Sequence, residues 1–271
     1  MSIENPQGIQ NSLFPEPSKA VYEQPLSERI RSFLRLEYLF TLINSTIGTQ
    51  SEWASRISLE TIIDITDVLT RTDIKAELIK ELDRQSVVLS RLQSNPGVDH
   101  SRLKSTISSL QNLLSQLHSS ECQPGQTVRK DELIASIRQR LTIPGGTCSF
   151  DLPGYHYWLS KPGPQRNAQL QQWLADLRIM QDGIGVILGV VRESASPTQV
   201  TANSGFFQQP LDTDLSYHMV RVLLPADSPF YPEISAGRHR FTIRFLEQKN
   251  TLLRPSQTDA DVYFELERCV F

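Results

Sequence analysis

Cysteine is scarce in this chain, and no hydrophobic stretch is long enough to cross a bilayer. The 271 residues include only three cysteines, Cys122, Cys148 and Cys269. An odd number of widely separated cysteines fits neither a disulfide framework nor a paired-cysteine metal site, so reduced thiols in the cytoplasm are the simplest interpretation. A membrane-spanning helix needs roughly 20 consecutive apolar residues, and the mean hydropathy here is −0.29. We therefore expect a cytoplasmic protein with no membrane-spanning segment.

Neither sign of charge dominates the composition. Lysine and arginine together number 27 and aspartate and glutamate 30, which gives a formal net charge of −3. A general nucleic-acid coat is normally basic throughout, so this balance argues against one, and any anion-binding surface must be local. Hydrophobic residues make up 39% of the chain and charged residues 21%, a composition typical of a protein with a packed core.

Motifs for metal binding and catalysis are also missing. The five histidines, His100, His118, His156, His218 and His239, form no HExxH or HxH pattern. The segment Pro144–Thr147 lacks the lysine and spacing of a phosphate-binding loop, and no GxSxG sequence occurs. Asp151 and Asp182 lie near turns, but nothing pairs them as acid and base. We expect no metal, no cofactor and no catalytic residue.

The first half of the chain, after its N-terminal tail, has helical spacing of apolar residues. Residues 1–21 are polar and proline-bearing, and we expect them to form a disordered tail. From Leu26 to about Leu141 apolar residues recur at steps of three and four, with Asp73 and Asp99 placed to cap two long helices. The segment Asn95–Gly97 separates these two helices, so the sequence predicts an antiparallel helical hairpin.

The pattern then changes to strands with one helical interruption. Cys148, Phe150 and Leu152 alternate with polar residues, and His156–Leu159 follows a Pro-Gly pair, so both segments are expected to be strands. Helical spacing returns over 166–192. Beyond Pro197 four further segments are predicted as strands, namely 205–207, 217–224, 241–246 and 262–270.

These patterns predict an α+β fold. An N-terminal all-α helical domain is followed by a C-terminal antiparallel β domain, and one long helix is inserted between strands and packs on the helical domain. The expected boundaries are 22–141 and 166–196 for the helical domain, and 142–165 and 197–271 for the β domain.

The most informative stretch is Arg238–Phe245. Alternation with a period of two puts Phe241, Ile243 and Phe245 on one face of a strand, and Arg238, Arg240, Thr242 and Arg244 on the other. Lys249 and Arg254 extend the basic character. Guanidinium groups suit carboxylates or phosphates, so this face is a candidate anion-binding surface. A solvated strand face that only keeps a sheet edge soluble explains the spacing equally well.

Several long blocks resemble the ZapD family of bacterial division proteins. They are Tyr22–Arg29, Leu34–Glu37, Glu77–Arg84, Pro96–Asp99, Arg138–Gly146, Cys148–Pro153, Tyr231–Ser235 and Arg240–Phe245. The similarity extends in order over nearly the whole chain from Tyr22. It implies a helical domain joined to a β domain, a symmetric homodimer and no catalytic activity.

The resemblance also implies a function and a set of residues. ZapD-like proteins cross-link FtsZ filaments into bundles at the division ring, in the cytoplasm at midcell, and hold the C-terminal tail of FtsZ in a basic pocket between the two domains. Matched to that pocket are Arg240 and Arg244 on the strand, His156, Arg71 and, in a family block, Arg35. Glu132 departs from the pattern, since a close relative would offer a basic residue there.

Other functions stay open at this point. A nucleic-acid-binding regulator would use the same arginine face, although the acidic net charge argues against it. A small-molecule enzyme with its site in a domain cleft is a third alternative. If a peptide tail binds, Tyr155 or Tyr157 is the aromatic surface expected to receive its apolar residues.

Overall fold

The computed structural model describes residues 19–71, 73–94, 97 and 99–271, and in this part the chain forms two compact units. A helical unit contains residues 25–194 together with Val270 and Phe271. A β unit contains the chain up to residue 24 and residues 195–269. The α+β fold class predicted from the sequence is confirmed.

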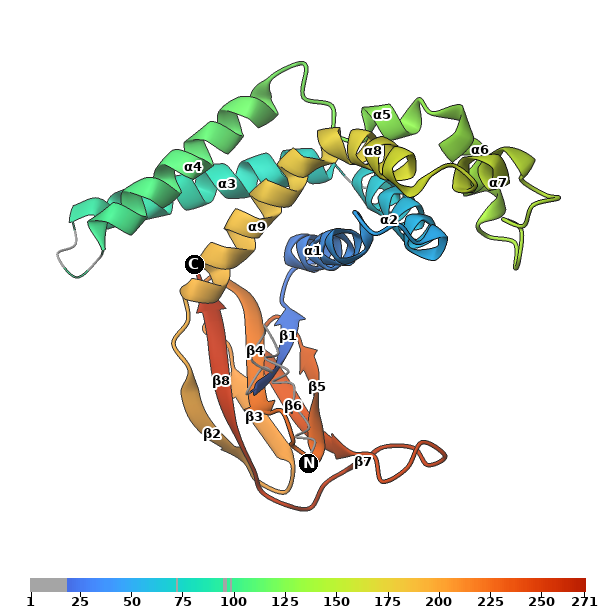
Figure 1. Ribbon diagram of the computed structural model, residues 1–271. Helices are drawn as coiled ribbons and strands as arrows, with labels where there is room; N and C mark the ends of the chain where they lie inside the picture. The colour runs from blue at the N-terminus through green and yellow to red at the C-terminus, as the bar shows by residue number, and fades with distance from the viewer. Residues whose placement is uncertain (1–18, 72, 95–96, 98) are drawn as a thin grey trace, which may run out of the picture. The chain divides into compact units, whose positions relative to one another are not determined.

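The helical unit is built from long helices joined by short connections (Figure 1). In chain order they are α1 (Glu28–Thr46), α2 (Glu52–Arg71), α3 (Ile74–Arg91), the 3₁₀ turn η1 (Leu92–Ser94), α4 (His100–His118), α5 (Gln126–Arg129), α6 (Glu132–Arg140), α7 (Pro153–Leu159), α8 (Gly163–Leu174), η2 (Ala175–Leu177) and α9 (Arg178–Glu193).

Side-chain caps explain where four of these helices begin. The hydroxyl of Ser27 and the carboxylates of Asp73, Asp99 and Asp131 each accept a hydrogen bond from a backbone N–H in the first turn of α1, α3, α4 and α6, respectively. Such caps satisfy N–H groups that have no partner inside the helix. The two caps predicted from the sequence, Asp73 and Asp99, are confirmed. Helices α3 and α4 pack side by side as the predicted hairpin (Figure 1).

The core of the helical unit lies where α1, α2, α3, α4, α8 and α9 meet. Helix α9 packs against α1, α3 and α4, while α8 packs against α2. The unit's fully buried apolar side chains include Ile30, Phe33, Leu36, Leu59, Ile62, Leu78, Leu82, Leu110, Leu170, Leu174, Ile184 and Leu188. Residues of α8 and α9 are buried together with residues of α1 to α4. This confirms that the helix predicted over 166–192, observed as α8, η2 and α9, packs on the helical domain.

A buried carboxylate holds the first turn of α1 to α3. Glu81 is 0% exposed and accepts hydrogen bonds from Arg29 Nη1 at 2.8 Å and from Arg84 Nη2 at 2.5 Å. Arg84 in turn donates to the backbone oxygen of Phe271 at 2.7 Å. A charge taken out of water is tolerated only when it is paired and hydrogen-bonded, as it is here.

The strands expected at 148–152 and 156–159 are wrong. Pro153 occupies the first turn of α7, where its missing N–H has no cost. Tyr155, Trp158 and Leu159 then follow at helical spacing and are buried, and the Trp158 ring lies 5.6 Å from that of Trp173. Residues 142–165 therefore belong to the helical unit rather than to the β domain.

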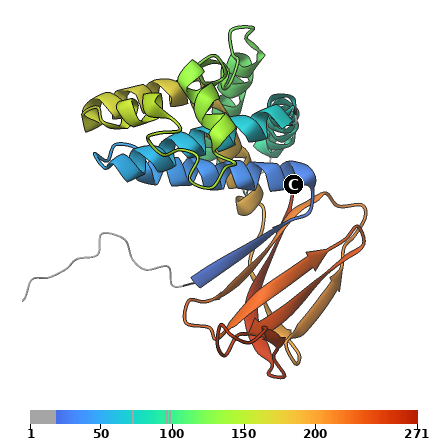
Figure 2. The ribbon, with the colours of Figure 1, turned by 90° about the vertical axis from the view of Figure 1, so that its right-hand side faces the viewer.

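The β unit consists of two antiparallel sheets (Figures 1 and 2). Its strands are β1 (Lys19–Pro25), β2 (Thr198–Ala202), β3 (Phe206–Pro210), β4 (Tyr217–Pro225), β5 (Phe230–Ala236), β6 (Arg240–Glu247), β7 (Ser256–Gln257) and β8 (Val262–Val270). One sheet has the order β1-β4-β8-β2, and the other has the order β3-β6-β5 with β7 also paired to β6.

Strand β1 changes two expectations about the chain's organisation. The tail predicted for residues 1–21 is wrong for residues 19–21, which belong to β1, and residues 1–18 lie outside the described part. Because β1 pairs with β4 in one sheet, helices α1 to α9 are inserted between the first two described strands of the β unit. The prediction of a single helix inserted between strands is corrected accordingly.

Phenylalanine rings join the two sheets. Phe264 of β8 lies 5.6 Å from Phe207 of β3 and 5.0 Å from Phe245 of β6, measured between ring centroids. Phe207 also lies 6.2 Å from Phe241 of β6. Aromatic pairs at these separations contribute beyond the area that they bury. These contacts fix which face of β6 points into the core.

The described residues include neither a membrane-spanning helix nor a clustered metal site. None of the helices in this part of the chain combines the length and apolar character that a membrane crossing requires. Nowhere in the same part do three or more His, Cys, Asp or Glu side chains lie together as a metal site would need.

Replacing Glu81 by alanine should destabilise the helical unit, because Arg29 and Arg84 would lose their shared carboxylate. We expect the free energy of unfolding to fall by about 3 kcal/mol, the lower end for breaking a buried pair, since both arginines keep some contact with water. Asp83→Ala, at an exposed acid two residues away, is the matched control. Urea unfolding followed by circular dichroism measures both, and equal stabilities would show that Glu81 holds nothing together.

Candidate functional site

The outer face of β6 presents the arginines singled out from the sequence. Phe241, Ile243 and Phe245 are 0% exposed, whereas Arg240 and Arg244 are exposed. Because strand residues alternate, the two guanidinium groups lie on the same face, four residues and about 13 Å apart along the strand. The predicted alternation is confirmed, and both arginines lie outside the core.

Each of these arginines has a different local environment. Arg244 lies opposite Glu233 of β5 in the strand register, and its Nη2 donates to the Glu233 carboxylate. Their side chains are 53% and 52% exposed, so this ion pair is weak. Arg240 lies opposite Pro210 of β3 and has no ion pair within the described residues. The face therefore carries one unpaired cation and one loosely paired cation.

A hollow of about 660 Å³ opens beside Arg244. We call it the β5–β7 hollow; it is lined by Tyr231, Pro232, Glu233, Arg244, Leu246, Arg254, Pro255 and Gln257. Strand β5 provides Tyr231 and Glu233, β6 provides Arg244 and Leu246, and the connection between β6 and β7 brings a second cation, Arg254. The hollow thus combines two guanidinium groups with apolar side chains, and its size is that of an ordinary ligand pocket.

The remaining candidate residues belong to the helical unit. Arg35 lies in the middle of α1, Arg71 is the last residue of α2, and His156 lies in α7. All three side chains are exposed. Glu132, where a basic residue was expected by family resemblance, is exposed in the first turn of α6. A carboxylate there interacts favourably with the positive end of the helix dipole.

Acidic neighbours on α2 surround Arg71. Asp67 lies one turn before it and Asp64 two turns before it. Partial burial and the Asp67 carboxylate raise the pKa of Asp64, whereas the Arg71 guanidinium lowers it. Asp67 itself pairs with Arg138 at 3.3 Å, so the acid that feels the Arg71 charge is Asp64.

Arg71 and the α7 region lie at opposite ends of α2. The Arg56 guanidinium, in the second turn of α2, lies 5.1 Å from the ring centroid of Tyr155, next to His156. Fifteen residues of helix, or about 22 Å, separate Arg56 from Arg71. The structure does not bring Arg71 and His156 together, so a single small ligand group cannot contact both.

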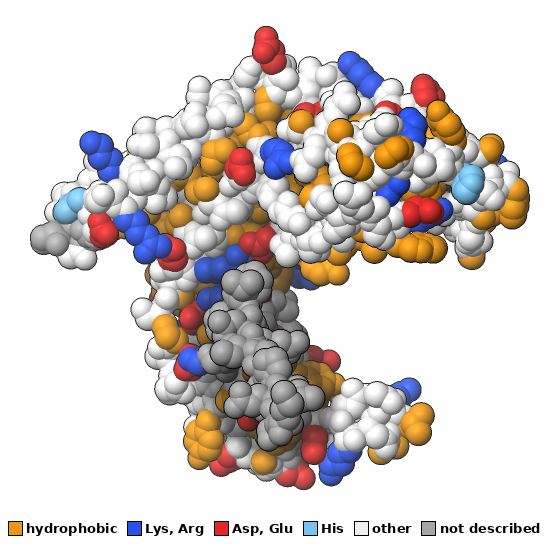
Figure 3. Space-filling view, viewed as in Figure 1, with side chains coloured by type: hydrophobic (Ala, Val, Ile, Leu, Met, Phe, Trp, Pro, Cys, Tyr) orange, Lys and Arg blue, Asp and Glu red, His pale blue; other side chains and the backbone are white. Residues whose placement is uncertain are grey.

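Aromatic surface near His156 comes from Tyr157 rather than from Tyr155. Tyr155 is fully buried, and burial raises the pKa of its hydroxyl. Tyr157 is 67% exposed, and Trp53 at the start of α2 is 72% exposed. Figure 3 shows hydrophobic side chains gathered around α6 and α7. Of the two tyrosines proposed to receive apolar residues, only Tyr157 is accessible.

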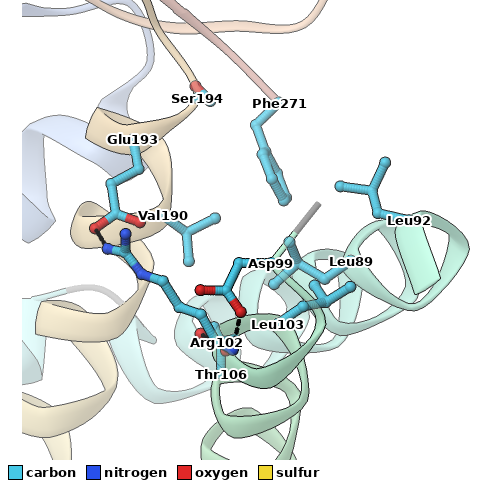
Figure 4. Close-up of a pocket in the computed structure, with 10 residues that line it drawn as sticks. All are labelled: Leu89, Leu92, Asp99, Arg102, Leu103, Thr106, Val190, Glu193, Ser194 and Phe271. Atoms are coloured by element: carbon cyan, nitrogen blue, oxygen red, sulfur yellow. Dashed lines mark hydrogen bonds and ion pairs between the residues drawn. The ribbon is translucent and has the colours of Figure 1, made fainter. Parts of the chain in front are cut away.

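A second hollow, of about 330 Å³, lies within the helical unit (Figure 4). Leu89, Leu103, Val190 and Phe271 give it apolar walls, and the nearby charges already have partners. Arg102 pairs with Glu193, and the Asp99 carboxylate accepts hydrogen bonds from N–H groups of the first turn of α4. The hollow offers apolar surface and no pair of groups arranged as acid and base.

Comparison with known proteins identifies one family over most of the chain. The family model described as "ZapD: Cell division protein" matches residues 34–244. The chain belongs to the ZapD family. All five candidate residues, Arg35, Arg71, His156, Arg240 and Arg244, lie within the matched segment.

Individual ZapD proteins are similar over nearly their full lengths. The cell division protein ZapD of Methylococcus capsulatus is 40% identical over 253 residues, covering 93% of this chain and 99% of that protein. Those of Ralstonia nicotianae and Azoarcus sp. are 38% and 35% identical over 252 and 248 residues, covering 93% and 92% of this chain and 99% and 98% of each relative. This ZapD-family chain therefore has a role in cell division.

The structure adds residues to the site that the sequence did not single out together. Tyr231 and Leu246 lie opposite each other in the register of β5 and β6, and both line the hollow beside Arg244. Arg254 was noted only as an extension of the basic stretch. Its place in the hollow depends on the fold of the connection between β6 and β7, which leaves no periodic signal in the sequence.

Arg71→Gln should raise the pKa of Asp64 further, because the substitution removes a cation that lowers it. Carboxyl-detected NMR during an acid titration measures this pKa directly. Arg35→Gln, which removes an exposed arginine from α1, should leave it unchanged. An Asp64 pKa that does not respond to Arg71→Gln would show that Arg71 points away from these acids and keeps its full charge for a partner.

Proposed function

We propose that this protein binds the C-terminal tail of FtsZ through its exposed basic side chains and, as a homodimer, cross-links FtsZ filaments at the division site. Membership of the ZapD family supports a division role. The observation that carries the proposal is the outward-facing pair Arg240 and Arg244 on β6. Arg35, Arg71 and His156 join the proposed tail-binding residues by resemblance to the family.

Arginine suits a partner that carries carboxylates. Its planar guanidinium forms two parallel hydrogen bonds with one carboxylate, and such charge-assisted bonds are stronger than neutral ones. Arg240 and Arg244 are separated by about 13 Å along β6, a distance that four residues of an extended peptide span. An acidic tail running along the strand therefore contacts both in turn.

Apolar side chains next to these cations favour a peptide over a bare anion. Tyr231, Leu246 and Pro255 line the β5–β7 hollow beside Arg244, and Tyr157 is exposed next to His156 in α7. Apolar residues of a bound tail bury surface against such groups, which adds affinity that electrostatics alone does not supply. A tail that is both acidic and apolar fits each of these two surfaces.

Cross-linking requires two tail-binding sites on one particle. A single contact through exposed charges is weak and sensitive to salt. Two sites on a homodimer, facing filaments that display many tails, convert the second contact into an intramolecular event and raise the overall affinity. Bundling then follows from bivalency without any further contact.

The nucleic-acid alternative has less support. Binding to a phosphate backbone draws on many cations along a continuous path, whereas this chain has a net charge of −3. Figure 3 shows acidic and basic side chains interspersed over the face in view, with no broad basic area. Gel-shift assays with labelled RNA or DNA at physiological salt test this alternative. An affinity for nucleic acid equal to that for the FtsZ tail would favour it.

The double variant Arg240→Glu/Arg244→Glu should lose tail binding and keep its fold, because both side chains lie outside the core. Two charge-assisted contacts correspond to about a 100-fold loss in affinity or more. Fluorescence anisotropy with a labelled FtsZ tail peptide measures the loss, and co-sedimentation with polymerised FtsZ measures bundling. Arg91→Glu/Lys104→Glu, which makes the same change in net charge at exposed positions of the helical unit, is the control. Full binding by the first variant would remove β6 from the proposed site.

The full chain should form a particle of about twice 30.7 kDa in solution at micromolar concentration. Sedimentation velocity gives this mass without a reference shape. A monomer that still binds the tail peptide would retain the binding site and exclude cross-linking by a homodimer.

A further inference from the structure

The β5–β7 hollow already contains one carboxylate where a ligand's carboxylate would bind. Glu233 and Arg244 face each other across the β5–β6 register, and the Glu233 carboxylate accepts a hydrogen bond from the Arg244 guanidinium. Both residues line the hollow. The anion-binding position of Arg244 is therefore occupied by a side chain of the same strand pair.

A second cation lies in the same hollow without such a partner. Arg254 is exposed, and in the described part of the chain it forms no ion pair. Tyr231, Leu246 and Pro255 give the same hollow apolar walls. Two cations and apolar surface thus share about 660 Å³, enough space for a short peptide segment.

We infer that the β5–β7 hollow binds a short acidic peptide segment and that Glu233 acts as a built-in competitor for it. A ligand carboxylate displaces Glu233 from Arg244, a second carboxylate pairs with Arg254, and an apolar side chain between them packs on Tyr231 and Leu246. This inference rests on the proposed function, in which the segment belongs to the FtsZ tail. Arg254 and Glu233 are additions to the residues assigned by family resemblance.

Exposure makes the displacement feasible. The Glu233 and Arg244 side chains are each about half exposed, and exposed pairs of this kind stabilise little. Both partners can rotate into water, so exchange of one carboxylate for another requires no rearrangement of the sheet. Competition between Glu233 and the ligand nevertheless lowers the apparent affinity for the ligand. Only the fraction of protein molecules in which Arg244 is free of Glu233 can bind.

Glu233 has an alternative role that the same variant tests. A carboxylate that orients Arg244 for a ligand would make Glu233 a positioning residue, and its loss would weaken binding. A competitor has the opposite effect. The direction of the change after Glu233→Gln therefore separates the two roles, and glutamine keeps the size of the side chain while removing its charge.

The experiment measures peptide affinity by fluorescence anisotropy on the full-length protein at two salt concentrations. Two labelled probes are used, the FtsZ tail peptide and a peptide of alternating glutamate and leucine. Glu233→Gln should bind both about threefold to fivefold more tightly at low salt, with a smaller gain at high salt. Asp227→Asn, at an exposed acid six residues earlier and outside the hollow, is the matched control for charge.

Arg254→Ala tests the second cation. We expect it to weaken binding of both probes by about tenfold, in line with the loss of one charge-assisted contact. Lys249→Ala, at an exposed lysine in the same connection and outside the hollow, should change binding little. Because both positions are exposed, neither substitution should unfold the protein. Circular dichroism checks that each variant is folded.

The outcomes separate the inference from the proposed function. Binding of the tail peptide with no response to Glu233→Gln or Arg254→Ala overturns the inference and leaves the proposed function intact. Binding of the glutamate–leucine probe alone, with the expected responses, supports the inference and contradicts the FtsZ partner. Tighter binding of a single-stranded DNA oligonucleotide than of either peptide, or no binding of either peptide, overturns the acidic-peptide assignment.

Discussion

Burial of one face of β6 determines the chemistry of the other face. Phe241 and Phe245 lie between the sheets. Phe245 contacts Phe264 of β8 directly, and Phe241 contacts Phe207, which in turn contacts Phe264. A slip of one residue in the strand register would expose these rings and bury Arg240 and Arg244, which has a prohibitive cost. Arg240 and Arg244 therefore face solvent on one side, with their backbone positions at a fixed separation along β6. Those positions depend on aromatic packing that is buried between the sheets.

Some local signals in the sequence were reliable, whereas others were overridden by packing against distant segments. The caps Asp73 and Asp99 and the alternation of β6 were found because each depends on a few neighbouring residues. Alternation around Phe150 suggested a strand, but the segment after Pro153 is α7, where Trp158 packs on Trp173. Strand β5 has Pro232 in its centre and weak alternation, so its pairing with β6, and with it the contact between Glu233 and Arg244, had no sequence signal.

The candidate residues were predicted in two ways, from strand periodicity and from family resemblance, and the structure agrees better with the first. Arg240 and Arg244 followed from strand periodicity as well as from family resemblance, and their shared exposed face is observed. Arg71 and His156 followed from resemblance alone. Both are exposed, yet the length of α2 separates Arg71 from the α7 region, and Arg71 interacts electrostatically with Asp64. Within the helical unit, only an extended ligand could contact both Arg71 and His156.

Under the proposed function, a weak individual site would let the protein distinguish filaments from free subunits. If competition by Glu233 lowers the affinity of one site by about threefold, a particle held by two sites loses about ninefold, because the two contacts multiply. The affinity for a lone tail is then so low that salt and other charges easily displace the tail. A dense row of tails restores binding, because a released site rebinds at high local concentration. Tighter single sites would bind free subunits nearly as well as filaments. If the protein cross-links filaments as proposed, the exposed ion pair at Arg244 would set the density of tails at which cross-linking begins.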